Sequence, residues 1–174
     1  AVLGVYFKLQ TFIYMPANGI VQGMRPIIGY NYGAGESSRV KSTIRYSLLT
    51  AAGLMLTGTI LALALPKQIL ALFDADAALM SAGVTALRII SLGFLVSSVG
   101  LIYSGVFEAI GNGRNSLIIS LLRQFVITIP LSFILTRFFG PTGVWISFPV
   151  GELCASAAAF CLLKKYQNGA FSPL

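Results

Sequence analysis

Histidine is absent from the sequence, and cysteine and tryptophan are nearly so, with two cysteines and one tryptophan. The absence of histidine removes the commonest metal ligand and acid–base residue. Cys154 and Cys161 stand on one face of a single apolar stretch, too far apart along a helix axis to form a disulfide or share a metal. Because the chain also lacks a nucleophile–base pair, we expect neither an enzyme nor a bound cofactor.

Charged side chains are scarce as well. They make up 10% of the chain against 56% hydrophobic residues, and the mean hydropathy is +0.85. Soluble domains carry about 25% charged residues, so this composition is typical of a protein in a lipid bilayer. The net charge of +7 comes from 12 basic and 5 acidic residues. Since most aromatic residues lie inside apolar runs, this excess indicates cytoplasmic loops of a membrane protein and no nucleic-acid partner.

Five apolar stretches are long enough to cross a bilayer, which needs about 20 residues per helix. We therefore predict an all-α, polytopic transmembrane bundle with spans at about 2–28, 47–65, 89–107, 115–136 and 142–163. Lys8 and Arg25 can extend from the first span toward the membrane surface. A shorter amphipathic stretch at about 76–88 predicts an interfacial helix that runs on into the third span.

Successive connecting segments lie on alternating sides of the membrane, and the basic residues are distributed unevenly between these two sets of segments. One set carries only Lys67, Arg88 and Arg137, whereas the other carries Arg39, Lys41, Arg45, Arg114, Lys164 and Lys165. The positive-inside rule places the second set and the C-terminus in the cytoplasm. The first span then enters from outside, so five spans imply a sixth upstream. We expect a fragment of a multi-pass protein of the cytoplasmic (inner) membrane.

Residues 22–40, QGMRPIIGYNYGAGESSRV, concentrate glycine where the first span ends. A phosphate-binding loop would show GxGxxG or GxxxxGK after a strand, whereas this stretch has neither pattern and follows a membrane span. We therefore interpret Gly29, Asn31, Gly33 and Gly35 as a hinge. In this interpretation Pro26 and the glycines end the helix and turn the chain in left-handed conformations.

The same stretch also resembles a family signature. GIVQGMRPIIGYNYGAG is similar to the motif of multidrug and toxic compound extrusion (MATE) transporters. FDAD, GNGRNS and the W-x-x-x-P-x-x-E pattern that ends at Glu152 resemble the C-terminal half of that family in the same order. The resemblance covers essentially the whole chain, and it implies five of the six helices in one lobe of a two-lobe, 6+6 transporter.

The resemblance also implies an activity and its partners. Such a transporter would export drugs, organic cations or other amphipathic small molecules in exchange for Na⁺ or H⁺. Its partners would be these substrates, the lipid bilayer and the missing N-terminal lobe of the same protein. The ion-binding residues of that first lobe cannot be carried over, because the lobe is absent from this sequence.

Two charged residues fall inside expected spans, where each is costly unless paired. Glu152 lies near the middle of the last span, and Arg123 lies about eight residues from the cytoplasmic end of the fourth. At about 1.5 Å of rise per residue their depths differ by roughly 5 Å, which two long side chains can bridge. The sequence leaves open a structural salt bridge and a cation or proton site. Glu108, at the cytoplasmic edge, is assigned to a solvated loop.

Several polar side chains within the spans are candidates for lining a cavity: Gln10, Asn18, Gln22, Ser97, Ser98, Tyr103, Ser104 and Gln124. In a membrane bundle such groups also form hydrogen bonds between helices, so packing is the alternative for each of them. Pro16, Pro130 and Pro149 fall inside spans and permit kinks there.

These features together favour a cation-coupled antiporter that works by alternating access and exports drugs. One alternative is a lipid-linked oligosaccharide flippase of the same superfamily, which would use a basic cavity. Arg123 is the main cation within the spans, and this sparseness argues against the flippase. The other alternative is a membrane-assembly subunit that transports nothing itself.

Overall fold

The computed structural model describes residues 2–73 and 77–170. These residues form helices joined by short turns, with no strand among them, so the predicted all-α bundle is confirmed. In chain order the helices are α1 (Val2–Gly33), α2 (Ser37–Ala64), α3 (Pro66–Ala71), α4 (Ala77–Ala109), α5 (Gly113–Leu121), the π-helix η1 (Leu122–Ile127), α6 (Thr128–Phe139) and α7 (Pro141–Ala170).

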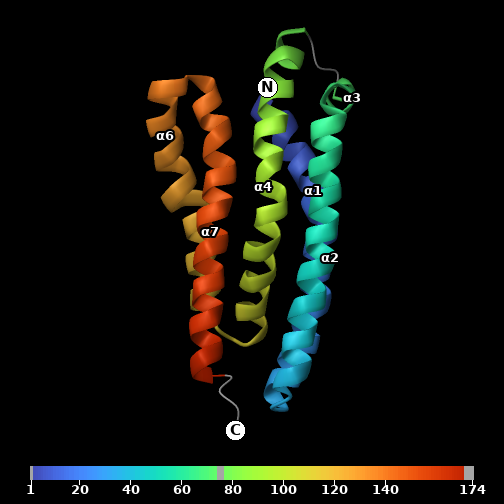
Figure 1. Cartoon of the computed structure of the whole chain (residues 1–174), viewed down its shortest axis with the longest axis vertical. Coiled ribbons are helices and arrows are strands. Elements are labelled where there is room, and N and C mark those ends of the chain that lie inside the picture. Colours follow the sequence, from blue (N-terminus) through green and yellow to red (C-terminus); the bar gives the residue numbers. More distant parts are fainter. Residues whose placement is uncertain (1, 74–76, 171–174) are drawn as a thin grey trace.

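The helix α4 occupies the middle of the bundle. It packs against α1 and α2 on one side and against α7 on the other, while α6 packs against α7 at the outer edge (Figure 1). The long helices run roughly parallel to the longest axis of the molecule. The C-terminal ends of α1, α4 and α7 lie at the bottom of the bundle in this view. The short helix α3 and the turn between α6 and α7 lie at the top.

Four segments within the described residues are long and apolar enough to cross a membrane: Ser37–Ala64, Leu79–Ala109, Gly113–Phe139 and Pro141–Tyr166. The helix α1 has 32 residues but is not among these four, and it carries Lys8 and Arg25. Residue 76, the start of the expected interfacial helix, lies outside the described residues. From Ala77 onward that stretch is the first part of α4. Likewise α2 begins at Ser37, so the basic residues at 39–45 belong to the same helix as the span.

Two clusters of buried side chains form the core, and α4 contributes to both. The first joins α4 to α1, α2, α5 and α7 around Ile102, Val106 and Phe107. The second joins α4 to α1 and α2 around Ile90 and Phe94. A side chain enclosed on all sides makes many dispersion contacts, so these clusters fix the position of α4.

Glycines let two helices approach α4 closely. A Cβ atom at Gly105 would lie 2.6 Å from Val21 Cγ1 of α1. On the opposite face, a Cβ atom at Gly93 would lie 3.0 Å from Pro149 Cα of α7. Contacts of this kind are typical of helix packing in membranes, where small residues bring backbones together.

The glycine-rich stretch is mostly helical, which corrects the hinge interpretation. The helix α1 continues through Pro26 and ends at Gly33, so Gly29 and Asn31 lie within it. Asn31 is buried and its Nδ2 donates to the carbonyl oxygen of Ile27 at 2.8 Å. Gly35 alone in this stretch has a positive φ, +75°, and it makes the turn into α2. Gly29 instead allows a close approach, because its Cβ would lie 3.2 Å from the carbonyl oxygen of Ala109.

The segment 113–139 contains a π-helix that the sequence did not predict. The turn Leu122–Ile127 separates α5 from α6, and the hydroxyl of Thr128 donates to the carbonyl oxygen of Arg123 at 2.6 Å. Pro130 follows within the first turn of α6. Because proline has no N–H and its ring crowds the preceding turn, Pro130 offers one local explanation for the wider turn.

Candidate functional site: an intramembrane cavity

A cavity of about 340 Å³ lies between α1, η1, α6 and α7. Its apolar wall is largely aromatic and includes Phe7, Phe125 and Phe148. Its polar wall is formed by Gln10, Arg123, Gln124, Thr128, Ser132, Ser147 and Glu152. Apolar walls with a few polar groups are typical of small-molecule sites, and this one is large enough for a small ligand.

The carboxyl group of Glu152 is the acidic group on the cavity wall. The hydroxyl of Tyr14 lies 3.4 Å from its Oε1 and donates to Ser97 Oγ at 2.7 Å. Glu152 Oε2 is buried and has no hydrogen-bond partner. A buried carboxyl oxygen without a partner is unfavourable, so this group can gain stability by binding a cation or a proton.

Arg123 projects from η1 and lines the same cavity as Glu152. The structure records no salt bridge between the two side chains, so the direct pair that their depths suggested is not formed here. They instead place opposite charges on the wall of one cavity. A bound ligand, ion or water can therefore interact with both groups without first breaking a salt bridge.

Comparison with known sequences places the chain in a family. The MatE family profile matches residues 1–134. The chain belongs to the MatE family. It is 28% identical over 156 residues to the multidrug export protein MepA of Staphylococcus saprophyticus, an alignment that covers 89% of this chain. The same alignment covers 34% of MepA, so the chain spans about a third of the curated relatives it matches.

Solved structures of MATE transporters share the fold. One is the outward-facing conformation of a multidrug resistance MATE family transporter of the MOP superfamily. Its TM-score is 0.92 at 21% identity, over 98% of this chain and 39% of that chain. The MATE multidrug transporter DinF-BH gives a TM-score of 0.87 at 33% identity, over 98% of this chain and 38% of that one. The bundle is thus a part of the MATE fold.

The structure brings only some of the expected cavity residues of this MatE chain together. Gln10 and Gln124 line the cavity with Arg123 and Glu152, whereas Asn18 and Gln22 are exposed on the outside of α1. Ser98 is buried and donates to the carbonyl oxygen of Leu95 at 2.6 Å. Tyr103 is buried and stacks on Phe160, with ring centroids 6.5 Å apart. These two residues serve packing.

Sequence reasoning missed several residues of the site. Thr128 and Ser132 follow Gln124 at every fourth position and line the cavity with it, and this spacing was a readable signal in the sequence. Tyr14 of α1 carried no such signal, because only tertiary packing brings its hydroxyl group to Glu152. Ser97 of α4 was among the residues expected to line a cavity, and it instead accepts the hydrogen bond of Tyr14.

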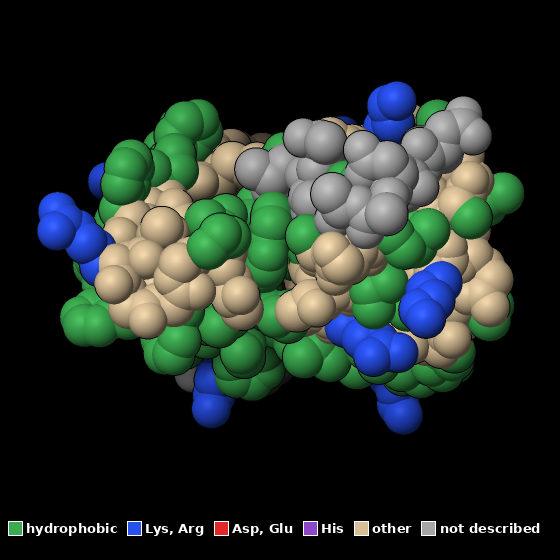
Figure 2. Space-filling view, turned by 90° about the horizontal axis from the view of Figure 1, so that it is seen from above, with side chains coloured by type: hydrophobic (Ala, Val, Ile, Leu, Met, Phe, Trp, Pro, Cys, Tyr) green, Lys and Arg blue, Asp and Glu red, His purple; other side chains and the backbone are tan. Residues whose placement is uncertain are grey.

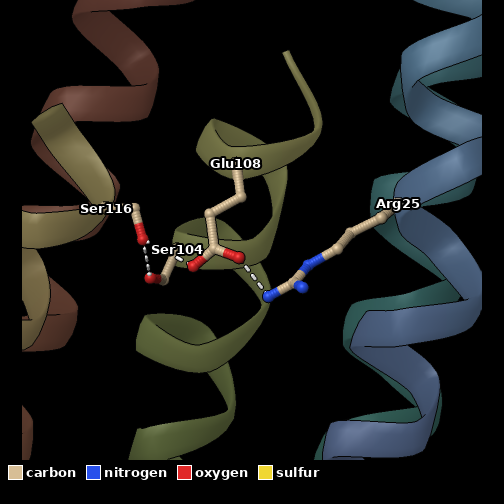
Figure 3. Close-up of polar contacts among 4 residues, drawn as sticks. All are labelled: Arg25, Ser104, Glu108 and Ser116. Carbon is tan, nitrogen blue, oxygen red and sulfur yellow. Dashed lines mark hydrogen bonds and ion pairs between the residues drawn. The ribbon is translucent and has the colours of Figure 1, made fainter. Parts of the chain in front are cut away.

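A second polar cluster lies at the end of the bundle where α4 meets α5. One carboxylate oxygen of Glu108 pairs with the guanidinium of Arg25, and the other accepts a hydrogen bond from Ser116 Oγ at 2.8 Å (Figure 3). Ser104 Oγ lies 2.7 Å from Ser116 Oγ. Glu108 thus lies in the last turn of α4 and not in a loop as expected, while 38% of its side chain is exposed as a solvated position requires. Arg25, Ser104, Glu108 and Ser116 are called the Glu108 cluster below.

Proposed function

We propose that the MatE-family protein containing this chain exports amphipathic or cationic small molecules through the cytoplasmic membrane by alternating access. A gradient of Na⁺ or H⁺ drives the export, and Glu152 binds the coupling cation or proton. One observation carries this proposal: a buried carboxyl oxygen without a partner on the wall of a cavity between membrane helices. Ionisable groups in such positions are functional by default.

The rest of the cavity supports the same proposal. Phe7, Phe125 and Phe148 offer aromatic surface to an apolar ligand or a cation. The relatives named above are a multidrug export protein and multidrug transporters, which agrees with small-molecule export. The missing N-terminal lobe of the same protein would complete the pathway, in keeping with a chain that covers 34% of MepA.

The distribution of charge supports an orientation for the bundle. The end where α1 finishes and α2 begins carries Arg39, Lys41, Arg45, Arg114, Lys164 and Lys165. Figure 2 looks down on the other end, where separate Lys and Arg side chains project from a surface of mixed hydrophobic and other side chains. Since basic residues favour the cytoplasmic side, we place the first end and the C-terminus in the cytoplasm.

The decisive experiment changes the charge of Glu152 in the complete protein. Glu152→Gln should leave the protein folded but abolish gradient-driven efflux from proteoliposomes, measured in turn with a Na⁺ and a pH gradient. Glu36→Gln is the matched control, because Glu36 is exposed and its side chain caps no helix. Efflux that persists in Glu152→Gln would remove Glu152 from the mechanism.

A purely structural role for Glu152 gives a different pattern. In that case Glu152→Gln should destabilise the protein, and Arg123→Leu combined with Glu152→Leu should restore both stability and efflux. Efflux restored in the double variant would therefore assign the two charges to packing alone.

A further inference from the structure

The Glu108 cluster ties α5 to the centre of the bundle. Ser116 is buried on α5, and its hydroxyl donates to Glu108 and contacts Ser104, both on α4 (Figure 3). Arg25 of α1 pairs with the other oxygen of the same carboxylate and so holds it in place. Ile119, one turn farther along α5, is buried in the core with α4. The first part of segment 113–139 is thus fixed against α4.

The second part of the same segment is fixed against a different helix. Gly143 and Gly151 of α7 lie so close to Leu135 and Thr128 of α6 that a Cβ atom at either glycine would overlap with them. Between these two attachments lies η1, in which no residue is buried. A π-helical turn holds more residues than an α-helical turn, so η1 can accommodate a difference in helical register between the two attachments.

This arrangement links the Glu108 cluster to the cavity. Arg123 and Gln124 belong to η1, and both line the cavity. If the attachment of α5 through Ser116 is weakened, the two ends of the segment constrain η1 less, and η1 can relax toward α-helical geometry. A change of one residue in helical register turns a side chain by about 100° around the axis. Arg123 and Gln124 would then point in a different direction relative to Glu152.

We propose that Glu108 is a positioning residue for the cavity: by holding Ser116, it keeps η1 in the π-helical register that directs Arg123 and Gln124 toward Glu152. The competing explanation is local, since Pro130 alone relieves its own steric conflict by widening the preceding turn. The two explanations differ in what Ser116 does. In the proposal, the contact between the hydroxyl of Ser116 and α4 determines the direction of Arg123 and Gln124 in η1. If Pro130 alone causes the π-helix, these two residues keep their direction without that contact.

The test follows a cysteine on the cavity wall of the complete protein. Gln124→Cys, in a background of Cys154→Ser and Cys161→Ser, reports the position of η1 through its rate of labelling by a maleimide. Because one hydrogen bond shifts an equilibrium on the order of fivefold, Ser116→Ala and Glu108→Ala should each change that rate about fivefold. Glu108→Gln keeps an acceptor for Ser116 and should stay within about twofold of the parent. Phe133→Cys, on α6 beyond η1, is the control reporter and should label at the parent rate in every background.

Each outcome separates the two explanations. Equal labelling of Gln124→Cys in the parent and in Ser116→Ala would overturn the proposal. It would also be overturned if Pro130→Ala changed the rate while the Glu108 cluster was intact. Should Ser116→Ala fail to fold, Glu108→Ala and Glu108→Gln still decide, because the proposal requires the first to differ from the second. The readout does not depend on transport, so it is independent of the proposed efflux activity.

Discussion

The helix α4 and the segment 113–139 have nearly the same hydropathy but opposite environments. Their most apolar windows average 1.9 and 2.0, yet 61% of the first window is buried inside the protein against 6% of the second. In a bilayer both environments suit an apolar side chain, since lipid is as apolar as a protein core. Hydropathy therefore identifies a span, whereas close packing by glycine and the placement of polar groups decide whether it lies at the centre or at the edge.

The two regions also differ in what they contribute to the candidate site. Within the described residues α4 carries much of the core, whereas the outer segment carries the π-helix and a large part of the cavity wall. A segment that packs on one side can change register at a lower cost than one enclosed on all sides. The loosely packed segment is thus the part in which we expect conformational change.

The largest expected effect comes from replacing one phenylalanine in each region by alanine. Phe107 of α4 is fully buried, whereas Phe133 of α6 is 74% exposed. Phe107→Ala should lower the free energy of unfolding by about 3 kcal/mol or more, because it leaves a cavity in the packed core. Phe133→Ala should change it by less than about 1 kcal/mol, measured by unfolding in mixed micelles. Similar losses in both variants would mean that the outer segment is packed as tightly as α4 in the complete protein.

A smaller effect is expected where helices approach one another. Gly105→Ala places a methyl group 2.7 Å from Met24 Cε and closer still to Val21. It should therefore destabilise the protein by about 2 kcal/mol. Gly53→Ala is the matched control, because nothing lies within 4 Å of a Cβ atom there. This control should be neutral or stabilise the helix by up to about 1 kcal/mol in the same unfolding experiment. Equal effects would remove the close α1–α4 contact as a source of stability.

The smallest effect should be the same at two turns, the one that leads from α4 into segment 113–139 and the one between α1 and α2. Gly35 turns α1 into α2 with φ +75°, and Gly111 turns α4 into α5 with φ +76°. Alanine resists this left-handed conformation, so Gly35→Ala and Gly111→Ala should each cost about 1 kcal/mol. The control is Gly33→Ala, at the last residue of α1, where φ is not positive and little change is expected. A much larger loss at Gly35 than at Gly111 would show that packing, and not backbone conformation, sets the cost.

Much of the fold was predictable because apolar runs of membrane length are a local property of the sequence. The all-α bundle and the general positions of its helices follow from them. The burial of α4 could not be predicted, because its hydropathy matches that of a peripheral segment. The hinge interpretation was wrong for Gly29, because glycine marks both turns and close helix contacts, and only the position of Ala109 distinguishes the two.

The site was predictable to a similar extent. Charge inside an apolar run was enough to select Glu152 and Arg123 as candidates, and both line the cavity, while their role in transport stays a prediction. The π-helix was not predictable, since it depends on how α5 and α6 are each attached to other helices. The same holds for the pair of Arg25 and Glu108, whose residues are far apart in the sequence and meet only where α1 crosses α4.

The hydroxyl of Tyr14 has one hydrogen atom and two neighbouring acceptors, Ser97 Oγ and Glu152 Oε1. It can satisfy only one of them at a time, and Ser97 in turn donates to the carbonyl oxygen of Phe94 at 2.7 Å. The orientation of a single O–H bond therefore depends on whether Glu152 is charged, protonated or occupied by a cation. If Glu152 binds the proposed cation or proton, the O–H bond of Tyr14 should turn toward Ser97, and an infrared measurement of its stretching frequency would detect that change.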